Sequence, residues 1–129
     1  KMYSAITNNI RISVFPEYDI KNSFPAENRF VFRYNITIQN LGNDAVKLHK
    51  RRWLIYDLGF GFTEVNGDGV IGLTPTLEPG EEFNYFSNVI LRSGVGNMQG
   101  SYLFENLLTN GSFQSEIPKF NLVSEVLCN

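Results

Sequence analysis

Apolar and polar residues alternate with a period of two along much of this chain. The longest such segment runs from Arg29 to Asn40, where apolar side chains occupy every second position: Phe30, Phe32, Tyr34, Ile36 and Ile38. Polar side chains fill most positions between them. A period of two over this length predicts a β-strand with one buried face. The turn residues from Asn40 to Asp44 are expected to end it.

Further strands are predicted in the segments 10–14, 45–56, 83–91, 100–104 and 113–122. Pro16 is expected to end the first of them. The segment from Phe83 to Leu91 has apolar side chains on both faces, which predicts a central strand. No segment has a sustained period of 3.6 residues, and turn residues recur at regular intervals. The sequence therefore predicts an all-β fold, an antiparallel sandwich or barrel.

The composition is that of one compact domain. The chain has 129 residues, of which 43% are hydrophobic, 14% aromatic and 19% charged. Aromatic residues favour the pleated surface of a sheet. No basic face can be inferred from a net charge of −2, so no nucleic acid is expected as a partner. No signal peptide or long apolar run is recognised, so no membrane association is expected. The single cysteine, Cys128, cannot form an internal disulfide, which fits a cytoplasmic protein.

The segment EVNGDGVIG, Glu64 to Gly72, contains the pattern G-x-G-x-x-G of dinucleotide-binding proteins. That fingerprint requires a helix after the glycines, because the helix N-terminus holds the pyrophosphate. Pro75 and Pro79 lie where this helix would be, and proline in a helix interior costs about 3 kcal/mol. A turn between strands is therefore the favoured interpretation. The alternative is an anion site made of backbone N–H groups at Gly67, Asp68, Gly69 and Gly72.

The other conspicuous cluster is the basic run Lys50, Arg51 and Arg52 beside Trp53. One interpretation is a surface that binds an acidic partner. The favoured one is a solvated strand face next to a buried tryptophan. His49 is the only histidine, so neither a hydrolase triad nor a metal site built on histidines is expected. The sequence predicts no catalytic residues, no cofactor and no metal.

The order of several segments resembles that of the ApaG family. The resemblance covers roughly Ile10 to Leu122 and includes the glycine segment Glu64 to Gly72. The other matching segments are NRFVFRYNITIQNLGNDAVKLHKRRWLIYD (28–57), PTLEPGEEFNYFS (75–87), MQGSYLFE (98–105) and IPKFNL (117–122).

This resemblance implies a single immunoglobulin-like or fibronectin-type-III-like antiparallel β-sandwich over residues 10–122. Residues 1–9 are then an N-terminal lead or an expression remnant, and residues 123–129 an extension past the family's usual end. The family has been linked to cobalt and magnesium handling, and its glycine motif has been proposed to contact pyrophosphate. The same domain occurs within eukaryotic F-box proteins, where it looks like a protein-binding module.

The leading hypothesis is therefore a non-enzymatic cytoplasmic module that binds another protein. The alternative, from a different class, is a sensor that binds a pyrophosphate-containing small molecule, such as a diadenosine polyphosphate, at the loop from Gly67 to Gly72. A homodimer formed through exposed sheet edges is a further expectation.

Overall fold

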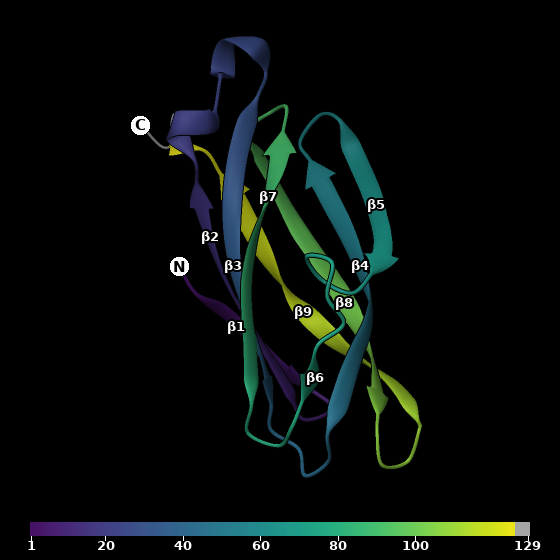
Figure 1. The fold of residues 1–129 in the computed structure, drawn as a ribbon. Helices are drawn as coiled ribbons and strands as arrows, with labels where there is room; N and C mark the ends of the chain where they lie inside the picture. The colour runs from purple at the N-terminus through teal and green to yellow at the C-terminus, as the bar shows by residue number, and fades with distance from the viewer. Residues whose placement is uncertain (126–129) are drawn as a thin grey trace.

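Two antiparallel β-sheets face each other in the computed structural model, which describes residues 1–125 (Figure 1). The first sheet has the order β1-β2-β3-β7: β1 (Tyr3–Thr7), β2 (Ile10–Tyr18), β3 (Phe30–Asn40) and β7 (Glu82–Leu91). The second has the order β5-β4-β8-β9: β5 (Gly61–Asp68), β4 (Val46–Asp57), β8 (Val95–Asn106) and β9 (Ser112–Val123). The short strand β6 (Thr76–Leu77) also pairs with β4. The antiparallel β-sandwich predicted from the sequence is confirmed.

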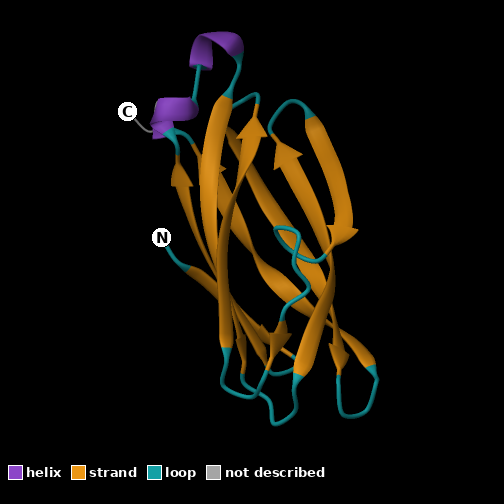
Figure 2. Ribbon diagram, in the orientation of Figure 1, coloured by secondary structure: helices purple, strands orange, loops and turns teal. Residues whose placement is uncertain are grey.

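Between the first strand and the end of the last, helical structure is confined to short turns (Figure 2). Two 3₁₀ turns, η1 (Ile20–Asn22) and η2 (Pro25–Glu27), connect β2 to β3. No helix among residues 1–125 is long and apolar enough to cross a membrane.

Aromatic side chains from both sheets meet in the core. Trp53 of β4 is 4% exposed, and its ring centroid lies 5.5 Å from that of Tyr34 on β3 and 6.0 Å from that of Phe120 on β9. Both contacts have edge-to-face geometry, which aromatic quadrupoles favour. The interpretation of Trp53 as a core residue is confirmed. These rings join the two sheets at the centre of the sandwich.

Two proline positions show how the sheet accommodates a missing N–H group. Pro16 was expected to end a strand, but β2 continues to Tyr18. The pairing of β1 with β2 stops at Val14, so Pro16 lies where β2 is an edge strand, and there a ladder donor can be absent. Pro118 lies within β9 at a register shift opposite Met98 and Gly100. Such bulges are the other position where a sheet tolerates proline.

The position predicted for the segment 83–91 is wrong. It forms β7, which within residues 1–125 pairs only with β3 and is therefore an edge strand. Its outward side chains Phe86 and Ile90 are 59% and 47% exposed. Apolar side chains on both faces suggested burial on both faces, but here the outer face is left uncovered. This correction determines which part of the surface is a candidate for binding.

The ends of the sandwich also differ from the predicted bounds of 10–122. The segment Tyr3–Thr7 is a strand of the first sheet, although the sequence pattern showed none there. Val123, the first residue of the predicted extension, ends β9. Residues 126–129, which include Cys128, lie outside the described part of the chain.

The packing predicts a large difference between two phenylalanines. Replacing Phe120, which is fully buried, with alanine should lower the free energy of unfolding by about 3–5 kcal/mol, because it leaves a cavity between the sheets. The matched change Phe86→Ala, at an exposed position, should cost less than about 1 kcal/mol. Urea denaturation of both variants measures this, and equal losses would contradict the described core.

Candidate functional site

The glycine segment forms the end of β5 and the turn that follows it. Gly67 lies opposite Arg51 and Asp68 opposite Lys50 in the ladder with β4. Beyond β5, Val70 and Leu73 exchange both backbone hydrogen bonds, at 2.8 and 2.9 Å. The two residues between them, Ile71 and Gly72, have φ angles of 44° and 76°. Positive φ at both central residues is the signature of a tight type I′ hairpin.

Two backbone donors of this segment are used within the protein. Gly69 N–H donates to the His49 carbonyl at 2.7 Å, and Val70 N–H donates to Leu73. Gly69 has a φ of 59°, and a Cβ atom there would lie 2.0 Å from the Leu73 carbonyl oxygen. No helix follows the glycines, as the two prolines predicted. The segment therefore has the geometry of a turn between strands rather than of a dinucleotide fingerprint.

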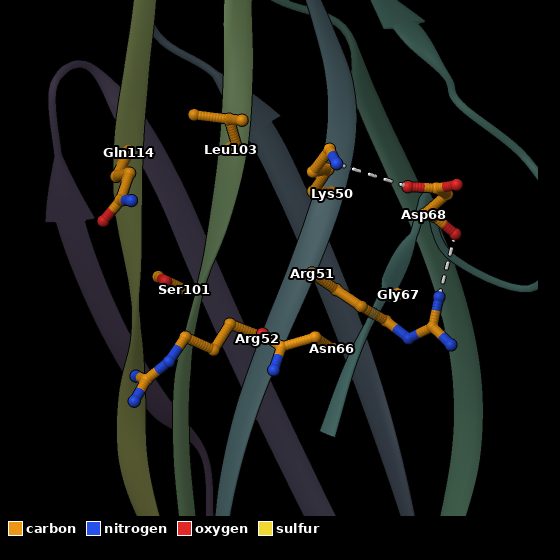
Figure 3. A pocket seen from close by; sticks show the side chains of 9 residues that line it. All are labelled: Lys50, Arg51, Arg52, Asn66, Gly67, Asp68, Ser101, Leu103 and Gln114. Carbon is orange, nitrogen blue, oxygen red and sulfur yellow. Dashed lines mark hydrogen bonds and ion pairs between the residues drawn. The ribbon is translucent and has the colours of Figure 1, made fainter. Parts of the chain in front are cut away.

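The three basic residues of β4 line a shallow depression of about 400 Å³ (Figure 3). Lys50 and Arg52 lie on the outer face of the sheet, where Ser101, Leu103 and Gln114 also line the depression. Each has a carboxylate beside it. Lys50 Nζ lies 3.8 Å from Asp68, and Arg52 donates to Glu64 at 3.0 Å. The outer face is therefore largely charge-compensated.

Glu64 holds its charge through these contacts. Its carboxylate accepts hydrogen bonds from the Asn66 amide at 2.8 Å and from Arg52. These bonds lower the pKa of Glu64 below its usual value, with the Asn66 bond as the largest cause. Because both side chains are about half exposed, solvent screens the interaction of Glu64 with Arg52, and the pair orients side chains more than it stabilises the fold.

Arg51 is oriented differently from its two neighbours. It lies opposite Tyr102, which is fully buried, and two residues before the buried Trp53, so it belongs to the inner face. Its Nη1 donates to the carbonyls of Asp68 at 2.9 Å and of Gly69 at 3.1 Å. A Cβ atom on Gly67 would lie 2.6 Å from the Arg51 Cζ. The first glycine of the motif thus makes room for this guanidinium.

A second cavity lies between the sheets beside Arg51, with a volume of about 310 Å³. Tyr34 and Tyr85 of the first sheet, Trp53 of the second and Val70 of the glycine turn line part of it. The hydroxyl of Tyr85 is hydrogen-bonded to that of Tyr102. Burial raises the pKa of Tyr34, and it raises those of Tyr85 and Tyr102 much further. The site thus combines neutral hydroxyls, apolar walls and one guanidinium.

His49 lies at a bulge of β4, where the register with β8 shifts between Leu48 and Lys50. Its Nε2 is 2.8 Å from the Glu105 carboxylate, and both side chains are partly exposed. Within residues 1–125, no group of three or more His, Cys, Asp or Glu side chains is placed to hold a metal ion.

Known proteins share both the sequence and the fold. The sequence profile of the ApaG domain matches residues 20–106. The chain belongs to the ApaG family. Among its relatives, Protein ApaG of Shewanella sediminis is 42% identical over 121 residues, covering 92% of this chain and 94% of that protein. Protein ApaG of Xanthobacter autotrophicus is 43% identical over 122 residues, covering 94% and 92%.

Solved structures agree with this assignment. The crystal structure of an ApaA protein from Bordetella pertussis superposes with a TM-score of 0.86 at 34% identity, covering 90% of this chain and 94% of that one. An X-ray structure of a second, similar chain has a TM-score of 0.85 at 36% identity, covering 95% and 92%. The ApaG fold therefore extends over most of the present chain.

The structure brings the glycine segment together with Arg51. Lys50, Arg51 and Arg52 all line the outer depression, as one surface, and Arg51 alone of the three also lines the inner cavity. A signal of the difference was present: Arg51 and the predicted core residue Trp53 are two positions apart, and such residues share a face. The tyrosine hydroxyls of the inner cavity were not anticipated at all.

Replacing Gly69 and Gly72 separately with alanine tests the geometry of the turn. Both have positive φ, so each variant should lose about 1–2 kcal/mol of unfolding free energy. Gly72 has open space around it, whereas a methyl on Gly69 overlaps a carbonyl oxygen, which should add about 1–3 kcal/mol. Chemical denaturation compares the two. A larger loss for Gly72→Ala would contradict the described turn.

The buried hydroxyls predict loss of stability in alkali. Unfolded tyrosine ionises near pH 10, while Tyr85 in the folded protein keeps its proton because burial raises its pKa. The folded state then binds more protons, so the unfolding free energy falls as pH rises, by about 1.4 kcal/mol per pH unit for each such group. Tyr85→Phe should make this slope shallower by that amount above about pH 10. Denaturation at several pH values measures it, and unchanged slopes would contradict the prediction.

Proposed function

We propose that this ApaG domain is a non-enzymatic module that binds another protein by adding one of that protein's strands to the edge of β7. The observation that supports the proposal is an edge strand with free backbone groups and apolar outward side chains. Addition of a strand to an exposed edge is a recurrent mode of peptide recognition, in which main-chain hydrogen bonds give affinity.

Hydrogen bonds elsewhere in the sheet identify the backbone groups at this edge. Asp19 N–H donates to Val31 O, so the odd-numbered residues of β3 direct their polar groups toward β2. The even-numbered residues then bond to β7, where Ile36 pairs with Tyr85. The intervening residues of β7 direct N–H and C=O to the open edge: Asn84, Phe86, Asn88 and Ile90. Among residues 1–125, no other strand pairs with this edge.

The other sheet edges are protected in ways that β7 is not. The β1 and β9 edges lie together, since Asn8 Nδ2 donates to the Gln114 carbonyl and Ser115 Oγ to that of Thr7. The β5 edge carries the charges of Glu64 and Asp68. From residue 83 to 91, β7 has no charge, no proline and no shift of register with β3. Charges, prolines and bulges are the devices that normally prevent strands from pairing at an edge.

The outward face indicates the chemistry of the partner strand. Phe86 is exposed, and the Arg33 guanidinium lies 4.7 Å from its ring centroid. Ile90 is exposed four residues further along the same face. A partner strand with apolar residues at every second position would continue this surface across the new pair. We therefore propose an extended, largely uncharged segment as the partner.

The other expectations from the sequence have less support. A second copy of the chain can also pair with β7, and the test below distinguishes this homodimer. Of the four donors expected for anion binding, Gly67, Asp68, Gly69 and Gly72, the N–H group of Gly69 is used internally. The family's link to cobalt and magnesium handling stays an expectation from resemblance.

A charge on the β7 edge should abolish partner binding. We expect Phe86→Lys to reduce partner capture from native lysate at least tenfold, because lysine at an edge opposes strand pairing. Phe62→Lys is the matched control, since Phe62 is a comparably exposed phenylalanine, 64%, on the β5 edge. It should retain binding within about twofold. The bound partner should also slow hydrogen exchange at the amides of Asn84, Phe86, Asn88 and Ile90.

Equal capture by both variants, or unchanged exchange at those four amides, would contradict this mode of binding. Turnover of a phosphate compound by the purified protein, without any captured partner, would contradict the module itself. Analytical ultracentrifugation distinguishes a homodimer from binding of another protein. A dimer that the Phe86→Lys variant no longer forms would show that a second copy of the chain pairs with the β7 edge.

A further inference from the structure

Arg51 is a half-buried cation without a carboxylate partner. Among residues 1–125, the ion pairs within 4.0 Å are those of His49 with Glu105, Lys50 with Asp68 and Arg52 with Glu64. Arg51 contacts only two backbone carbonyls. Removing a charge from water is unfavourable unless it is paired, so this partly buried guanidinium, which has no carboxylate beside it, is a candidate site for an anion.

The unused donors of Arg51 lie along one edge of its guanidinium. Nη1 is held by the carbonyls of Asp68 and Gly69, while Nε and Nη2 have no hydrogen-bond partner among the described residues. Figure 3 shows Nη1 directed to Asp68 and the side chain running away from Lys50 and Arg52. The fork of guanidinium donors matches the two oxygens of a carboxylate, and such bidentate pairs are among the stronger hydrogen bonds in proteins.

The inner cavity that Arg51 lines has apolar and polar walls in similar measure. Trp53, Val65 and Met98 line it from the second sheet, and Val89 lines it from β7. Its volume of about 310 Å³ is at the lower end of the range for small-molecule sites, roughly 300–1,000 Å³. Apolar walls with a few convergent polar groups are the usual composition of such sites.

We propose that this cavity binds a small carboxylic acid with an apolar body, whose carboxylate pairs with Arg51 and whose body packs near Trp53. This site uses mainly inward side chains, whereas partner binding at the β7 edge uses outward ones; Asn88 of that edge also lines the cavity. The loop supplies few backbone N–H groups for a multiply charged ligand, since those of Gly69 and Val70 are used internally. A monocarboxylate therefore fits better than pyrophosphate.

Phenylacetate is a suitable probe, and Trp53 is the reporter, since it is the only tryptophan in the chain. We expect phenylacetate to change Trp53 fluorescence saturably and to shift the Trp53 indole signal in NMR spectra. The neutral isostere phenylacetamide should bind at least tenfold more weakly, because it lacks the charge that pairs with the guanidinium. Pyrophosphate, which has no apolar body, should also bind at least tenfold more weakly.

Variants of Lys50, Arg51 and Arg52 distinguish binding at Arg51 from a general attraction of the anion to positive charge. Arg51→Gln should weaken phenylacetate binding at least tenfold. Lys50→Gln and Arg52→Gln remove the same charge from the outer face, and they should change binding less than twofold. Gly67→Ala should weaken binding as well, since its methyl would displace the guanidinium. Circular dichroism and melting temperatures establish that each variant is folded.

Three results would overturn the proposal. One is the absence of any Trp53 response at about 10 mM phenylacetate with the wild-type protein, which does not depend on a variant folding. Another is equal binding of phenylacetamide or tighter binding of pyrophosphate. The third is an equal loss of binding in Lys50→Gln and Arg51→Gln. None of these results bears on capture of a partner at β7, so the two proposals can fail separately.

Discussion

The β-bulge at His49 is the constraint on which the arrangement of the site depends. Along β4, the inward residues before the bulge are Val46 and Leu48, and those after it are Arg51 and Trp53. The one extra residue thus reverses which side chains point inward after the bulge, because side chains alternate with a period of two. Without it, the strand could not bury both Leu48 and Trp53. The bulge places Arg51 inside and its two basic neighbours outside.

The same bulge holds the glycine turn. The His49 carbonyl accepts a hydrogen bond from the Gly69 N–H. The Arg51 guanidinium lies beside Gly67 and donates to the carbonyls of Asp68 and Gly69. Two of the three motif glycines are therefore required by close approach rather than by a phosphate. The pattern G-x-G-x-x-G arises here because a side chain and a backbone carbonyl occupy the space where Cβ atoms would be. The same sequence pattern thus has a different physical role here than in dinucleotide-binding proteins.

The sequence was sufficient for the fold class because burial of one sheet face imposes alternation, and alternation is visible in the residues of β3. It was insufficient for β7, since apolar residues on both faces arise from burial of both faces and equally from an edge strand whose outer face is uncovered. Pairing partners depend on contacts distant in sequence, and no local pattern reveals them. The bulge was detectable in principle: Leu48 and Trp53 are an odd number of residues apart, yet both were expected to be apolar positions of one strand.

β7 contributes to both proposed sites through opposite sides of one strand. Tyr85, Ser87 and Val89 face the cavity and bond through their backbones to β3. Phe86 and Ile90 face solvent, and their backbone groups are the ones directed to the open edge. Along an antiparallel edge strand, the face of the side chain and the direction of the backbone N–H and C=O groups both alternate with a period of two. A residue whose side chain faces solvent here therefore also directs its backbone groups to the open edge. A substitution at Phe86 therefore alters the edge and leaves the cavity wall intact, whereas Arg51 affects the cavity without touching the edge.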